Sequence, residues 1–141
     1  MKIAFVSCTK SKESISCEAR KMYQKSILFS KAVKYIEQKD YDNWYILSAK
    51  YGLLSKEQII TPYNLTLNNM KLPERKAWAE QVLWQVQEQI QKKITQIDFY
   101  AGINYRKYLI PVLEQQGIVC NIPLQGKSIG KQMKFYTQNT K

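Results

Sequence analysis

The sequence predicts a single α/β domain, spanning residues 1–141, in which a mainly parallel sheet of about four strands has helices on both faces. Its length of 141 residues is that of one domain. The chain is 45% hydrophobic and 23% charged, so it can bury a core. Short apolar runs alternate along it with amphipathic stretches, and this alternation is typical of a parallel sheet covered on both sides.

The N-terminal half is predicted to form a strand, two helices and a second strand. Lys2–Ser7 is a short apolar run that indicates a buried strand, and the polar segment Cys8–Ser16 is a loop. We interpret Cys17–Gln24 as a short helix. Ser26–Gln38 is a longer helix whose first residue is suited to be its N-cap. Trp44–Ala49 is the second buried strand.

The C-terminal half begins with a long irregular segment, Lys50–Leu72, which holds several Gly, Pro and Asn breakers. The proline that follows this segment, at position 73, favours a helix over Pro73–Ile94, because the N–H that proline lacks is not needed in the first turn of a helix. The remaining predicted elements are a strand at Ile97–Ala101, a helix at Tyr105–Gln116 closed by Gly117, a strand at Ile118–Ile122 and a helix at Ser128–Thr137.

The composition excludes several classes of site. No histidine is present, so a Ser-His-Asp triad, a Cys-His dyad and a His-ligated zinc are excluded. The three cysteines are too few and too widely spaced for a disulfide framework or a zinc site, and we expect neither a metal nor a cofactor. The apolar runs are too short to cross a bilayer or to act as a signal peptide. We therefore expect a cytoplasmic protein that does not bind membranes.

The charge balance points to anionic partners. With 22 Lys and Arg against 11 Asp and Glu, the formal net charge is +11, and the surplus is spread along the whole chain. Such a charge favours DNA or a nucleotide as the partner, through neutralisation of phosphates. A lysine-rich composition that only keeps the protein soluble is the alternative, and the diffuse distribution leaves both open.

Polar segments follow each predicted strand. They are Ser7–Lys10, Ser48–Gly52, Ala101–Tyr105 and Pro123–Gly126. Because the carboxyl ends of parallel strands meet at one edge of the sheet, these segments are predicted to converge there. Their hydroxyls, lysines and glycine-backed amides suit a phosphate or nucleotide pocket. The candidate binding residues are Ser7, Cys8, Thr9, Lys10, Ser48, Lys50, Tyr51, Tyr63, Gly102, Tyr105 and Gly126.

Each candidate also has a structural reading. Cys8 lies beside lysines that would stabilise a thiolate, but a strand-end cysteine is more often a packing residue. Lys10 and Lys50 are natural phosphate ligands or ordinary surface lysines. Tyr63 could stack on a base. Alternatively, its loop only packs leucines into the core and exposes its other residues. Oligomeric state is left open by the sequence.

The strand-end segments also carry a resemblance. Five segments resemble a family of uncharacterised bacterial and phage domains: VSCTKSK at 6–12, LSAKYGLL at 47–54, PYNLTLN at 62–68, the G-x-x-Y of Gly102–Tyr105, and PLQGKSIG at 123–130. That family is distantly similar to YaaA-type DNA-binding stress proteins and to DNA-glycosylase-like enzymes. The resemblance implies an α/β domain with a strand-end pocket, found near nucleic-acid metabolism and phage conflict. The additional DNA-binding helical motif of YaaA-type proteins is not found here.

These observations lead to a nucleic-acid- or nucleotide-directed protein. In its catalytic form it would act like a DNA glycosylase at the N-glycosidic bond of a modified base, with Asn68 or Glu57 serving the sugar or the attacking water. In its non-catalytic form it would be a DNA-binding protein or a module that sequesters a nucleotide. A protein whose strand-end motifs merely close the fold is the third reading.

Overall fold

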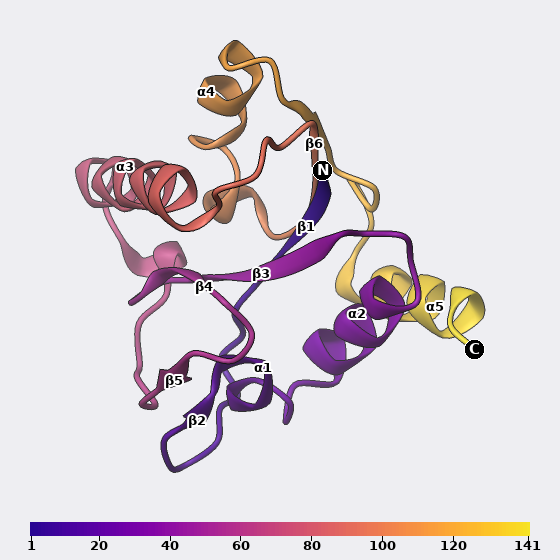
Figure 1. Cartoon of the computed structure of the whole chain (residues 1–141). Coiled ribbons are helices and arrows are strands. Elements are labelled where there is room, and N and C mark those ends of the chain that lie inside the picture. The colour runs from indigo at the N-terminus through magenta and orange to yellow at the C-terminus, as the bar shows by residue number, and fades with distance from the viewer.

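The computed structural model describes residues 1–141 and contains a five-stranded sheet in the order β4-β3-β1-β6-β7 (Figure 1). Four strands run parallel, namely β1 (Lys2–Ser7), β3 (Asn43–Ser48), β6 (Gln96–Tyr100) and β7 (Val119–Asn121). This confirms the predicted α/β class and the parallel strands. The fifth strand, β4 (Gly52–Leu54), pairs antiparallel with β3 at one edge and was not predicted.

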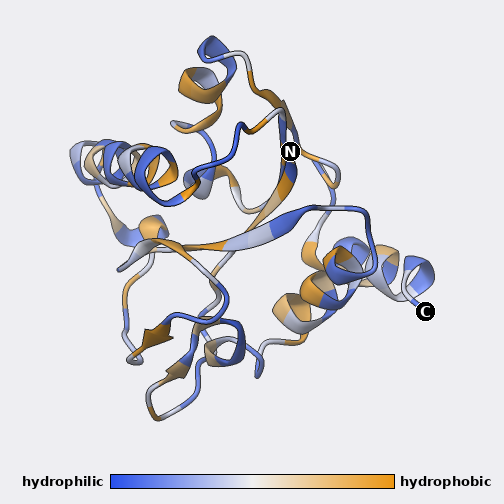
Figure 2. Ribbon diagram, viewed as in Figure 1, coloured by the Kyte–Doolittle hydropathy of each residue, from blue (hydrophilic) through white to orange (hydrophobic).

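Helices cover both faces of the sheet. Figure 1 shows α3 (Leu72–Gln89) and α4 (Ile110–Gln115) on one side, with α2 (Ile27–Glu37) and α5 (Ile129–Asn139) on the other. The short α1 (Ala19–Met22) packs on the same side as α2. In Figure 2, α3 and α5 alternate between hydrophilic and hydrophobic residues along their turns, as expected of helices with one buried face.

The core is organised around β1, which lies in the middle of the sheet. Its side chains alternate, so that Ile3 and Phe5 join the core under α3 and α4 while Ala4 and Val6 join the core under α2 and α5. Both faces of this strand are therefore buried, which explains why its sequence is a continuous apolar run and not an alternating one.

The segment Cys17–Gln24 is helical only in part, and the helix prediction is corrected there. Cys17–Glu18 form strand β2, which pairs antiparallel with β5 (Ile59–Ile60). The pairing partner lies about 40 residues further along the chain. Local sequence therefore carries no signal for it, and the strand shortens the helix to Ala19–Met22.

Two predicted helices are also shorter in the structure. The helix predicted for Pro73–Ile94 ends at Gln89, because Ile90 is extended and turns its side chain into the core. In the segment predicted as Tyr105–Gln116, residues Ile103–Tyr105 form a 3₁₀ turn, η2, and α4 begins only at Ile110. Proline at position 111 explains this start, because proline fits the first turn of a helix but breaks its interior.

The long segment after β3 contains more order than predicted. It holds β4, β5 and a second 3₁₀ turn, η1 (Leu67–Asn69). Gly52 starts β4 with φ +73°, a left-handed conformation suited to glycine. The Gln85 side chain of α3 lies against it, accepting the N–H of Leu53 at 2.8 Å and donating to the carbonyl of Tyr51 at 3.0 Å.

The strand order places a switch of direction at the centre of the sheet. From β1 the chain moves to β3 on one side, and from there it crosses to β6 on the other side of β1. In sheets of this kind ligands bind outside the carboxyl ends of the two strands between which the direction reverses, here β1 and β6. No helix of the structure is both long enough and apolar enough to span a bilayer.

Candidate functional site

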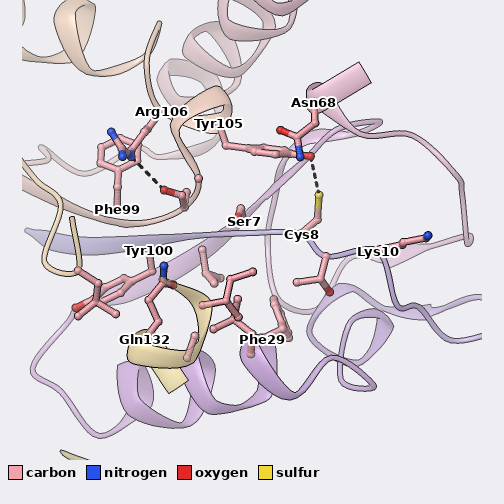
Figure 3. A pocket seen from close by; sticks show the side chains of 18 of the residues that line it. Ser7, Cys8, Lys10, Phe29, Asn68, Phe99, Tyr100, Tyr105, Arg106 and Gln132 are labelled. Atoms are coloured by element: carbon pink, nitrogen blue, oxygen red, sulfur yellow. Dashed lines mark hydrogen bonds between the residues drawn. The ribbon is translucent and has the colours of Figure 1, made fainter. Parts of the chain in front are cut away.

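A cavity of about 750 Å³ lies at this switch point, outside the carboxyl ends of β1, β6 and β7 (Figure 3). The loops after these strands form its centre, η1 and the segment before it form one wall, and α2 and α5 contribute the opposite wall. Its volume lies within the range of small-molecule sites. The convergence of strand-end loops that the sequence predicts is therefore present for β1, β6 and β7.

The structure divides the predicted site residues into two groups. Those that line the cavity are Ser7, Cys8, Thr9, Lys10, Asn68, Gly102, Tyr105 and Gly126. The lining does not include Ser48, Lys50, Tyr51, Glu57 and Tyr63. The first group follows β1, β6 and β7 or lies in η1, whereas the second belongs to the loop after β3 and the segment that continues from it.

The loop after β1 presents free backbone donors. Cys8 N–H makes the last sheet-like bond, to Leu47 O at 2.9 Å. The next four N–H groups, of residues 9–12, donate to no protein acceptor. Consecutive free N–H groups in a loop can bind an anion. Lys12 folds back over this loop, with its Nζ donating to Lys10 O at 3.2 Å, and burial lowers the pKa of its amine while the nearby Cys8 partly opposes that shift.

Tyr105 supports the pocket from the loop after β6. Its hydroxyl accepts from Leu67 N at 3.3 Å and lies 3.7 Å from the Cys8 sulfur, which donates to it (Figure 3). Its ring packs edge-on against Trp78 at 5.6 Å between centroids. Burial, with the Cys8 thiol adding to it, raises the pKa of Tyr105 to about 12, so the phenol stays neutral. Tyr105 thus ties β1 and η1 to β6.

The charged side chains of the cavity are all cations. They are Lys10, Lys12, Arg106 and Lys127, and no Asp or Glu lines it. Arg106 Nε donates to Ala101 O at 3.1 Å, which orients the guanidinium and leaves both terminal nitrogens without a protein partner (Figure 3). Neither Arg106 nor Lys127 is among the predicted binding residues, although each directly follows one of them, Tyr105 or Gly126.

Aromatic and amide side chains complete the lining. Figure 3 shows Phe29, Tyr100 and Gln132 on one side of the pocket, with Tyr105 and Asn68 on the other. The first three come from α2, β6 and α5. Phe29 and Gln132 were not predicted as site residues, because the face that a helix turns toward a cavity depends on its packing in three dimensions.

The residues after β3 have their polar groups occupied by one another. Ser48 is fully buried, and its Oγ accepts from Tyr51 N at 3.1 Å and bonds to the Tyr63 hydroxyl at 2.7 Å. The Tyr63 hydroxyl also bonds to that of Tyr23 at 2.7 Å. Burial is the main reason that the pKa of Tyr63 lies well above its ordinary value. This chain of hydroxyls leaves no group free for a ligand.

The other residues of this region face away from the cavity or into solvent. The Tyr51 hydroxyl bonds to Thr61 Oγ1 at 2.8 Å. Lys50 and Glu57 are exposed, and Glu57 lies in the turn before β5. The structure thus brings one of the two candidate catalytic residues, Asn68, to the pocket and leaves Glu57 outside it. No three His, Cys, Asp or Glu side chains are grouped as metal ligands would be.

Comparison with known proteins identifies the family of this chain. A family model described as a family of unknown function, DUF6884, matches residues 3–138, and the chain belongs to that family. Searches of the curated proteins and of the solved structures give no match. The matched range includes every residue that lines the pocket.

Proposed function

We propose that this member of the DUF6884 family binds a phosphate-bearing nucleotide, free or within a nucleic-acid strand, in the pocket at the ends of β1, β6 and β7. The observation that carries the proposal is the charge of the lining. Lys10, Lys12, Arg106 and Lys127 line the pocket without any carboxylate, although the chain contains 11 Asp and Glu. A site of this composition selects anions.

The loop after β1 and the Arg106 side chain lie toward opposite ends of the pocket in Figure 3, and each offers donors that would bind an anionic group of the ligand. Free N–H groups of residues 9–12 and the terminal nitrogens of Arg106 are donors without protein partners. A guanidinium fork suits phosphate because it donates two parallel hydrogen bonds. The position at the switch point of the sheet is where nucleotides bind in other doubly wound folds.

The remainder of the lining suits a base. The rings of Phe29 and Tyr100 lie almost fully buried in its wall, Gln125 and Gln132 carry amides that can donate and accept hydrogen bonds, and Asn68 carries a free amide donor. Apolar walls with a few convergent polar groups are the usual composition of a site for an organic ligand. The family that the strand-end motifs resemble is distantly similar to YaaA-type DNA-binding proteins, and this distant similarity agrees with a nucleotide as the ligand.

A glycosylase-like activity has less support than binding. Hydrolysis of an N-glycosidic bond needs a group that positions water or stabilises a cationic sugar. Asn68 is available for that role in the pocket, but no carboxylate is, and Glu57 lies elsewhere. Incubation with plain and modified DNA, followed by heating in alkali, tests this version. We propose binding without hydrolysis, so no strand breaks are expected.

Calorimetric titration of charge-matched variants tests the binding proposal. One double variant is Lys10→Gln with Arg106→Gln, and its control is Lys92→Gln with Lys93→Gln, which removes two exposed charges outside the pocket. The probes are the four ribonucleoside 5′-monophosphates and a single-stranded oligonucleotide. The pocket variant is expected to lose roughly 100-fold in affinity, as for two charge-assisted hydrogen bonds, and the control about twofold or less.

Equal losses of affinity in the two variants would show a general effect of charge and would overturn the proposal that the pocket binds the ligand. The absence of binding to every probe would overturn it as well. Salt separates the two forms of the ligand. A nucleic acid that contacts many phosphates loses affinity steeply between about 50 and 200 mM salt, whereas a mononucleotide depends on salt much less.

A further inference from the structure

Asn68 has one free polar group, and that group belongs to a residue that lines the pocket. Its backbone N–H donates to Thr66 Oγ1 at 3.2 Å, and its backbone carbonyl accepts from Arg75 Nη2 at 3.1 Å. Its side-chain Oδ1 accepts from Asn104 Nδ2 at 2.8 Å. Only the side-chain amine, Nδ2, has no partner in the protein. Asn68 therefore presents hydrogen-bond donors to the pocket and no acceptor.

Two residues outside the pocket, Arg75 and Asn104, together with the pocket residue Tyr105, hold Asn68 in this state. Arg75, on α3, also donates from Nε to Leu67 O at 2.8 Å, and the Tyr105 hydroxyl accepts Leu67 N at 3.3 Å. The 3₁₀ turn η1 is thus fixed from both sides. Neither Arg75 nor Asn104 lines the cavity. Both are positioning residues, and Asn104 sets which end of the Asn68 amide faces a ligand.

We infer that Asn68 Nδ2 determines which base the pocket accepts, by requiring a hydrogen-bond acceptor, a keto oxygen, at that point of the ligand. This inference rests on the proposed nucleotide function. Guanine and uracil carry a keto oxygen where adenine and cytosine carry an amino group. An amino group facing Asn68 would bring two donors together and leave both without an acceptor, which weakens binding.

The wild-type protein is expected to bind GMP more tightly than AMP, and UMP more tightly than CMP, by about tenfold in each pair, which is the size of one hydrogen bond. Ribose 5-phosphate, which has no base, measures the phosphate contribution alone. Dissociation constants for these five probes are obtained by calorimetry. The two nucleotides of a pair carry the same phosphate, so the ratio of their dissociation constants depends only on the base.

Two variants replace the donor that faces the pocket at position 68 by an acceptor, each in a different way. Asn68→Asp replaces the free amine by an acceptor oxygen. Asn104→Asp replaces the amide that donates to Asn68 by a carboxylate, so the Asn68 amide turns over to donate to it, and its oxygen then faces the pocket. Both variants should abolish or invert the preference for keto bases, and a residue that only supported the fold would not shift both ratios in that direction.

Asn69→Asp is the matched control, because it adds the same charge to the neighbouring pocket residue without touching the Asn68 amide. It should weaken all five probes together and keep the tenfold ratios. Equal affinities within both pairs in the wild type, or unchanged ratios in Asn68→Asp, would overturn the inference while leaving nucleotide binding intact. Failure of every probe, including ribose 5-phosphate, would overturn the proposed function and the inference with it.

Discussion

The loops after β1 and β3 leave the sheet at the same edge and have similar residues, yet only the loop after β1 lines the pocket. In each case the last residue of the strand is a serine, and a lysine follows it within three residues. After β1, four successive N–H groups are free. After β3, the Ser48 hydroxyl is consumed by Tyr51 and Tyr63. The residue types at a strand end therefore indicate a candidate binding loop. The loop that can bind a ligand is the one whose hydrogen-bonding groups have no partner in the protein.

The largest expected effect is on stability in the closed region. Tyr63→Phe removes the partner of the buried Tyr23 hydroxyl and one partner of Ser48, and should lower the free energy of unfolding by about 1–3 kcal/mol. Urea denaturation measures this. Tyr108→Phe removes a hydroxyl without a hydrogen bond in the structure and should stay within about 0.5 kcal/mol of wild type.

Nucleotide affinity of Tyr63→Phe should remain within about twofold of wild type, since Tyr63 is not part of the lining. A tenfold loss of affinity in the folded variant would contradict the division between the two loops and would return Tyr63 to the site.

A single-charge comparison gives the next largest effect. Arg106→Gln should weaken nucleotide binding by about tenfold, because it removes the guanidinium fork from the pocket. Lys50→Gln removes the same charge from the region after β3 and should change affinity by less than about twofold, since Lys50 is exposed and outside the lining. Titration with GMP measures both, and an equal loss would remove the distinction between the two regions.

The smallest effect is a pH dependence that belongs to the loop after β1. Burial lowers the pKa of Lys12 below that of an ordinary lysine, so its positive charge is lost at a lower pH. Affinity for a phosphate should therefore fall by a few fold as the pH rises above neutrality toward that lowered pKa. In Lys12→Gln the affinity should be weaker at neutral pH and should change less over the same range. An identical pH profile in both proteins would rule out Lys12 as a ligand.

Elements that depend on local sequence were predicted well. β1 has the predicted bounds because its apolar run fills a position buried on both faces. Ser26 caps α2 as predicted, accepting Phe29 N at 3.2 Å. β2, β4 and β5 were missed because each is defined by pairing with a distant segment or with the returning chain.

The site follows the same division. The place of Ser7 to Lys10, of Gly102 and of Tyr105 at the cavity could be predicted because the parallel-sheet rule places strand ends together. Which strand ends border the cavity depends on the strand order, and that order is set by long-range packing. For the same reason the sequence offered no means of separating Lys10 from Lys50.

The contact between Gln85 and β4 has a consequence for assembly. On the outer side of β4, the Gln85 amide accepts Leu53 N and donates to Tyr51 O, as the peptide of a neighbouring strand would. A further chain cannot pair with Leu53 N there without displacing the Gln85 side chain. The opposite edge, β7, has exposed Val119 and Asn121 and no such cover. Of the two edges of the sheet, β7 is therefore the one that no side chain covers in this way, and edge strands of that kind are where one sheet can pair with another.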